Sequence, residues 1–302
     1  MKSERSNNLF GIALMVGGMV GLSLGDLFLK LSARSLPVGE VMLVMGLGSA
    51  AIYLALVLAA GEGVWHKVLA SRLFWLRIGG EMVSGLGLFL ALALTPLSLV
   101  AAILQMLPLV TTLGAALFLA ERVGRHRIGS VLVGFAGVML IIRPGSADFD
   151  IGSLFTVLAV LGMALRDIVT RKIARLSDPQ PVSSRQLSFY SSLGLSVTGA
   201  GMLAVSGGAA IPHLSASLSL AAMVVSASIG YFMVTHATRI AELSVVSPYR
   251  YSRLLFSLLI GALVLQEVID PAMLAGSALV ILAGIYIWFR ETRISRQNRS
   301  AV

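Results

Sequence analysis

The sequence predicts an all-α polytopic membrane protein of ten transmembrane helices, arranged as two inverted five-helix repeats. Three observations lead to this fold class. Hydrophobic residues make up 57% of the chain and charged residues only 12%, which is about half the charge that a water-facing surface carries. Apolar blocks of membrane-spanning length recur along the whole chain. Patterns in the first half also return in the second half.

A helix needs roughly 20 apolar residues to cross a bilayer, and ten blocks of the sequence meet this requirement. The gaps leave no room for a soluble domain, and the short LTPL gap at 94–97 predicts a tight helical hairpin. No small-x-small cleavage site precedes Asp26 and Lys30, so we expect the first block to be an uncleaved span. The predicted spans are 10–29, 38–60, 74–93, 97–119, 127–143, 151–170, 186–206, 215–236, 243–264 and 270–289.

The basic residues predict the orientation of these spans. With the N-terminus inside, 16 of the 23 lysines and arginines lie in cytoplasmic segments and 3 lie on the opposite side. Cytoplasmic loops carry the excess of positive charge in membrane proteins. We therefore expect both termini to be cytoplasmic, and we attribute the net charge of +9 to orientation and not to nucleic-acid binding.

Several chemistries have no residues to support them. The chain has no cysteine, so it offers no disulfide framework or thiolate metal site. The G-x-x-x-x-G-K-[ST], H-E-x-x-H and G-x-S-x-G motifs are absent as well. We therefore expect neither an enzyme nor an ATP-driven pump, and no metal or cofactor.

The internal repeat is visible in two pairs of segments. SLGDLFLKLSAR (23–34) matches ALRDIVTRKIAR (164–175) at an offset of 141, and 95–121 matches 241–267 at an offset of 146. Each half, 1–145 and 146–302, then holds five spans, and this odd number turns the second half upside down. Such inverted repeats are typical of transporters in which the halves rock around a central site.

Three further segments carry a family resemblance. ERVGRHRIG (121–129), GVMLIIRPG (137–145) and ELSVVSPY (242–249) resemble the EamA type of the drug/metabolite transporter superfamily, and the likeness extends over nearly the whole chain. The resemblance implies a secondary transporter of small metabolites in the bacterial inner membrane. It leaves the substrate open.

Charged residues within the spans are candidate functional residues, because each costs at least about 2.5–3.5 kcal/mol to insert. Asp26 with Lys30, and Asp167 with Arg171, have the i,i+4 spacing of pairs that neutralise each other near a helix end. The alternative is that one aspartate is a proton-binding gate. Arg166 has no charged counterpart in the first half, and either snorkels to the interface or lines the transport path.

The third span adds Arg77 and Glu81. Arg77 lies near the cytoplasmic end and is expected to snorkel. Glu81 lies deeper, where it is either the partner of a buried arginine or a protonatable coupling site. We therefore take Asp26, Asp167 and Glu81 as the candidates for coupling or gating.

The ninth span carries the strongest candidate site. Tyr249, Arg250 and Arg253 share one helix face directly after Pro248. They line a cavity if the span begins near residue 243, or lie at the headgroups if it begins at the proline. Polar residues of other spans are either hydrogen-bond donors to cargo or helix–helix contacts. The predicted substrate-binding residues are Arg250, Arg253, Tyr249, Arg166, Glu81, Gln105 and Tyr231.

Guanidinium groups bind carboxylates and phosphates in bidentate geometry. The first hypothesis is therefore a secondary transporter of a small anionic or zwitterionic metabolite, carboxylate-bearing and amino-acid-like, such as an opine-type metallophore, with export favoured. The alternative, which the resemblance suggests, is a proton-coupled importer of a vitamin or cofactor such as riboflavin or S-adenosylmethionine. The expected partners are a small-molecule substrate, the lipid bilayer and protons, with the oligomeric state open.

Overall fold

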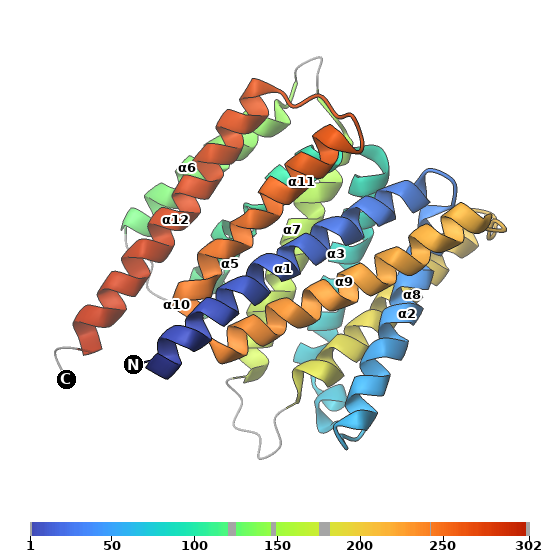
Figure 1. Cartoon of the computed structure of the whole chain (residues 1–302), viewed down its shortest axis with the longest axis horizontal. Helices are drawn as coiled ribbons and strands as arrows, with labels where there is room; N and C mark the ends of the chain where they lie inside the picture. The colour runs from blue at the N-terminus through green and yellow to red at the C-terminus, as the bar shows by residue number, and fades with distance from the viewer. Residues whose placement is uncertain (1, 120–124, 146–148, 175–181, 242, 300–302) are drawn as a thin grey trace.

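The computed structural model describes residues 2–119, 125–145, 149–174, 182–241 and 243–299, and all regular elements in these ranges are helical (Figure 1). The all-α class is therefore confirmed. The elements are α1 (Lys2–Ala33), α2 (Val38–Ala59), η1 (Lys67–Ala70), α3 (Arg72–Leu94), α4 (Leu97–Leu104), α5 (Leu107–Leu119), α6 (Arg125–Ile142), α7 (Gly152–Ala174), α8 (Ser184–Val205), α9 (Leu214–Ile240), α10 (Leu243–Val246), η2 (Ser247–Tyr251), α11 (Ser252–Leu263) and α12 (Pro271–Arg299).

Within the described ranges, seven helical stretches are long and apolar enough to cross a membrane. They correspond to α1, α2, α3, α4 with the start of α5, α7, α8 and α9. Ile128–Ile142 and Pro271–Tyr286 are shorter apolar helices. The chain is therefore a multi-pass membrane protein, while the count of ten spans stays a prediction.

Two of the predicted spans, 97–119 and 243–264, are interrupted. Gln105 and Met106 separate α4 from α5, and their N–H groups bond to carbonyls three residues back. Pro108 accounts for this break. In a continuous helix it could not donate a hydrogen bond to the carbonyl of Leu104, and its ring would clash with that carbonyl. In the second span, Pro248 lies at the start of η2, a 3₁₀ turn between α10 and α11. Neither span is the continuous helix that apolar length alone predicts.

The helices pack in pairs drawn from opposite halves of the chain. α1 lies along α9, α2 along α8, α3 along α7 and α6 along α12, and the first and last of these pairs are visible in Figure 1. α11 packs against both α1 and α4. Residues far apart in the sequence therefore meet throughout the bundle.

Small residues permit the closest of these contacts. A side chain at Gly21 would meet the backbone of Gly230 at 2.8 Å, and one at Gly162 would meet the backbone nitrogen of Ser84 at 2.5 Å. No Cβ fits at such distances, so glycine is required at both positions. Close backbone approach through small residues is a usual way for membrane helices to pack.

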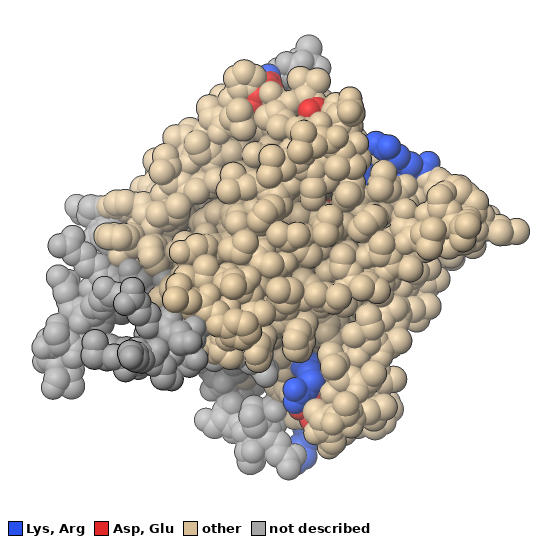
Figure 2. All heavy atoms as spheres, in the orientation of Figure 1, with Lys and Arg blue, Asp and Glu red and all other residues tan. Residues whose placement is uncertain are grey.

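The outer surface is apolar, as a lipid-facing surface must be. Figure 2 shows one face of the molecule, on which lysine, arginine and acidic side chains gather at the ends of the helices. Large hydrophobic side chains such as Leu132, Val197 and Leu263 are more than half exposed. Apolar exposure on this scale marks a membrane or protein interface.

Candidate functional site

Asp26 of α1 forms an ion pair with Arg253 of α11, with 2.7 Å between Oδ2 and Nη2. The expected Asp26–Lys30 pair is therefore wrong. Lys30 turns instead to the C-terminus of α3, where its Nζ donates hydrogen bonds to the carbonyls of Thr95 (2.6 Å) and Leu92 (3.2 Å). The last carbonyls of a helix accept no hydrogen bond from within that helix, so these two are available to bind the ammonium group of Lys30.

Arg166 joins two acidic residues. Its Nε lies 2.8 Å from Oδ1 of Asp167, and its Nη1 lies 3.4 Å from both carboxylate oxygens of Glu81 on α3. All three side chains are partly buried. Glu81 is therefore a partner of a partly buried arginine in this structure, and its role as a coupling site stays a prediction. The Asp167–Arg171 pair lies outside the described residues, because the Arg171 side chain is not among them.

Arg77 does not snorkel, and the expectation that it would is wrong. Its side chain is buried, with 5% of the residue exposed. Nε donates to Oγ1 of Thr170 (2.9 Å) and Nη1 donates to Oγ of Ser191 (2.8 Å). These hydroxyls come from α7 and α8, so acceptors from neighbouring helices replace the water that snorkelling would provide. Glu81 also interacts electrostatically with this arginine.

The charged groups described so far form one charged cluster with Arg250, namely Asp26, Arg77, Glu81, Arg166, Asp167 and Arg253. Arg250 differs from the other arginines of this cluster. It is exposed, and it makes no hydrogen bond or ion pair with any residue that the structure describes. It interacts electrostatically with Asp167, Arg166 and Arg253, so it belongs to the same charged cluster. Its guanidinium donors are therefore free to bind an anionic group.

Tyr231 presents an exposed aromatic ring that packs on a buried one, Tyr53. Tyr231 of α9 contacts Tyr53 of α2 edge to face, with ring centroids 6.1 Å apart and an interplanar angle of 80°. Tyr231 is 42% exposed. Tyr53 was not predicted, because no local pattern in α2 indicates which face meets α9. Tyr249 is 40% exposed.

Gln105 lies where the two interrupted spans meet. It is 9% exposed and its Nε2 donates to the backbone carbonyl of Tyr251, 3.3 Å away. Residues 105 and 251 are equivalent under the 146-residue offset, so the two breaks are in contact. In this structure Gln105 joins two helices, which is the second of the two roles considered for it.

A second polar network ties together the helix ends on the side of Lys30. Glu267 accepts hydrogen bonds from the backbone N–H groups of Leu97 (2.7 Å) and Ser98 (3.0 Å), and so caps α4. Asp150 accepts bonds from the Thr95 hydroxyl (3.3 Å) and from the backbone N–H of Gly152 (2.7 Å) at the start of α7. This network holds α1, α3, α4 and α7 together at one end of the bundle. Among the described residues, no group of acidic residues and histidines could hold a metal ion.

Comparison with known proteins gives relatives that are named as transporters. The chain is 29% identical to a riboflavin transporter of Vibrio cholerae over 199 residues, which span 66% of this chain and 65% of the relative. It is 25% identical to an S-adenosylmethionine uptake transporter of Rickettsia conorii over 99% of this chain and 100% of the relative. No family model matches.

A solved crystal structure shares the fold. It superposes with a TM-score of 0.64 at 19% sequence identity, covering 97% of this chain and 99% of its own. Together with the apolar helices, these relatives support a multi-pass membrane transporter of a small molecule and not an enzyme.

Proposed function

We propose that the chain is an alternating-access importer of the EamA type, with ten spans in two inverted repeats, 1–145 and 146–302. It lies in the bacterial inner membrane with both termini cytoplasmic. Its substrate is a carboxylate-bearing cofactor of the S-adenosylmethionine class. Of the two hypotheses from the sequence, this is the importer alternative and not the exporter.

The pairing of helices supports the inverted repeat. If α1 corresponds to α7 and α3 to α9, then the α1–α9 contact and the α3–α7 contact are the same contact in two copies. The residues agree, since Gly21 and Gly162 are 141 positions apart and Ser84 and Gly230 are 146 apart. These are the offsets of the sequence repeat. A two-fold axis between the halves accounts for both contacts.

The observation that carries the substrate class is the unpaired guanidinium of Arg250. Arg253 and Arg166 are engaged by Asp26, Glu81 and Asp167, and so have less capacity for a ligand. Arg250 is exposed and lacks a partner among the described residues. A carboxylate is the ligand group that a guanidinium binds best in bidentate form. S-adenosylmethionine carries one, together with an aromatic base that the exposed ring of Tyr231 would contact.

The relatives support import and leave riboflavin as a second candidate. Relatives that align over nearly the whole chain are named for uptake of S-adenosylmethionine. Two riboflavin transporters align over 66% and 74% of it. Riboflavin has an aromatic ring system but no carboxylate, so it would use the tyrosines and leave Arg250 without its ligand.

Counterflow in proteoliposomes tests the proposal. Vesicles loaded with unlabelled S-adenosylmethionine should accumulate the labelled compound faster than empty vesicles. Arg250→Gln should weaken apparent affinity by about ten- to a hundredfold, since a hydrogen bond to a charged group contributes roughly 1.5–3 kcal/mol. Arg34→Gln, at an exposed position beyond α1, is the matched control and should change nothing.

The outcomes separate the parts of the proposal. Riboflavin counterflow that is unaffected by Arg250→Gln would overturn the carboxylate assignment and favour the second candidate. Absence of counterflow with both compounds, in vesicles holding folded protein, would overturn the importer function.

A further inference from the structure

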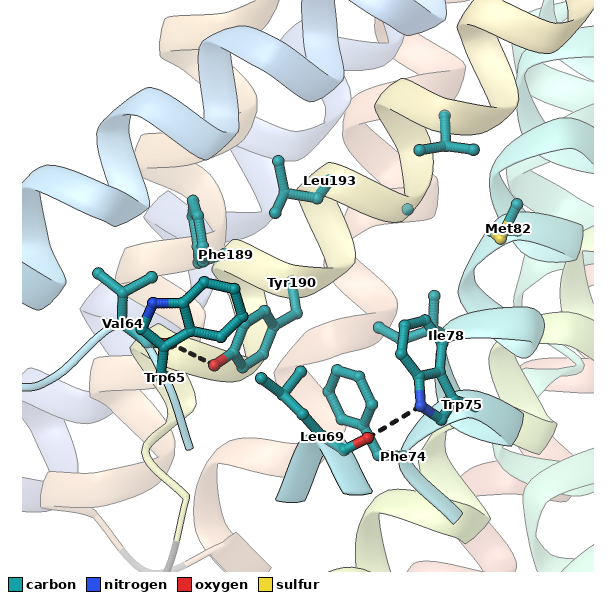
Figure 3. Close-up of a pocket in the computed structure, with 12 residues that line it drawn as sticks. Val64, Trp65, Leu69, Phe74, Trp75, Ile78, Met82, Phe189, Tyr190 and Leu193 are labelled. Atoms are coloured by element: carbon teal, nitrogen blue, oxygen red, sulfur yellow. Dashed lines mark hydrogen bonds between the residues drawn. The ribbon is translucent and has the colours of Figure 1, made fainter. Parts of the chain in front are cut away.

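An apolar groove lies between α3, α8 and the segment that joins α2 to α3 (Figure 3). Phe74, Ile78 and Met82 line it from α3, and Leu193 and Val197 line it from α8. Its volume is about 420 Å³ and none of its lining residues is charged. The groove therefore has the size of a ligand site, but its lining is apolar, unlike that of the charged cluster.

The groove opens to the outside of the bundle. Val197, Trp65 and Trp75 are 63%, 87% and 60% exposed. The groove follows α3 from Phe74 to Met82, which is on the order of 12 Å at the helical rise per residue. An elongated apolar slot that opens toward the lipid suits a hydrocarbon chain better than a polar metabolite.

Hydrogen bonds build the end of this groove that is formed by the joining segment. The hydroxyl of Tyr190 donates to the carbonyl of Val64, and Nε1 of Trp75 donates to the carbonyl of Leu69 at 2.9 Å. Figure 3 shows both bonds, with the joining segment held across the ends of α3 and α8. The groove is therefore a fixed feature and not a chance gap between two side chains.

The same end carries positive charge. Lys67 at the start of η1 and Arg72 at the start of α3 are exposed on either side of Leu69 in the chain. Glu62, the acidic residue nearest in sequence, is engaged by Arg185 and by the hydroxyl of Ser183. Tryptophan is enriched at the level of lipid headgroups. Basic residues at that level attract anionic lipids.

We propose that this groove binds an anionic phospholipid, with one acyl chain between α3 and α8 and the phosphate headgroup at Lys67 and Arg72. The positive charge at the end formed by the joining segment selects the headgroup, and the apolar slot orders the acyl chain. The site is independent of transport and of the substrate.

Tryptophan fluorescence can test this, because the chain has three tryptophans and two of them border the groove. Trp288→Phe leaves only Trp65 and Trp75 as reporters. The protein is placed in bilayers that contain a small fraction of lipid brominated on its acyl chains, which quenches nearby tryptophan. Brominated phosphatidylglycerol should quench roughly twofold more than brominated phosphatidylcholine at the same fraction, because the basic end favours the anionic headgroup.

Two variants locate the effect. Val197→Phe fills the groove from an exposed position and should remove the excess quenching. Val225→Phe, at a 52% exposed position on α9, is the matched control and should leave it unchanged. The double variant Lys67→Gln/Arg72→Gln should abolish the difference between the two lipids while keeping the groove.

Equal quenching by both lipids in the Trp288→Phe protein would overturn the proposal, since it would mean that only bulk lipid covers the groove. Excess quenching that survives both Val197→Phe and the double variant would overturn it too, because the lipid would then bind elsewhere. Stable dimers that disappear in Val197→Phe would assign the groove to a second copy of the chain.

Discussion

Arg253 and Asp26 are 227 positions apart, yet Nη2 of the arginine lies 2.7 Å from Oδ2 of the aspartate. Their side chains are 21% and 10% exposed. The pair joins α1 of the first half to α11 of the second. In a carrier whose halves move against each other, a contact of this kind must be broken or kept as a pivot.

The pair should be coupled energetically. Asp26→Asn or Arg253→Gln alone should lower the free energy of unfolding by about 3–5 kcal/mol, because each leaves one largely buried charge without its partner. The double variant should lose less than the sum of the two single variants. Thermal unfolding in detergent measures the three values. Strict additivity would show that the two groups do not interact in the membrane protein as purified.

The α1–α11 contact should also be open to covalent trapping. The hydroxyls of Ser23 and Ser257 lie 3.2 Å apart and both residues are fully buried. The chain has no native cysteine, so Ser23→Cys/Ser257→Cys would form its disulfide without competing thiols. If the two helices separate during transport, oxidation should stop counterflow and reduction should restore it.

Each single cysteine variant is a control for that experiment and should transport under both conditions. A cross-linked protein with full transport would mean that α1 and α11 move as one body. Gel mobility after cleavage within the chain confirms that the cross-link has formed.

The hydroxyls of Thr170 and Ser191 should matter more for stability than the buried arginine that they bind, Arg77. Thr170→Ala or Ser191→Ala leaves a buried guanidinium donor without an acceptor, which costs about 1–3 kcal/mol or more for a charged group. Arg77→Met removes the buried charge and keeps the volume, so it should cost less than either alanine variant. Unfolding midpoints of the three proteins decide the order. A larger loss for Arg77→Met would show that its interaction with Glu81 outweighs the cost of burying it.

The sequence predicts the positions of helices better than it predicts which side chains contact each other. Apolar length predicts the all-α membrane class, and the proline positions account for the breaks at Gln105 and in η2. The i,i+4 spacing of Asp26 and Lys30 shows only which residues adjoin on one helix. Their true partners come from α11 and from the end of α3, which only the packed bundle brings close. Tyr53 was missed for the same reason.

Proton movement is the driving force that the proposed importer needs, and Glu81 is placed to couple to it. Glu81 has both carboxylate oxygens 3.4 Å from Nη1 of Arg166, a looser contact than the 2.8 Å between Arg166 and Asp167. A carboxylate held loosely by its cation can exchange that contact for a proton. We therefore expect Glu81, and not Asp167, to carry the proton.

Glu81→Gln mimics the protonated side chain, so it should keep counterflow, which needs no net proton movement. It should abolish accumulation driven by an imposed pH gradient. Asp167→Asn is the matched comparison and should retain part of the gradient-driven uptake, since Glu81 is intact in it. Gradient-driven uptake by Glu81→Gln at the wild-type rate would exclude Glu81 as the coupling residue and leave Asp26 and Asp167 as the candidates, because they are the other carboxylates that contact the arginines of the cluster.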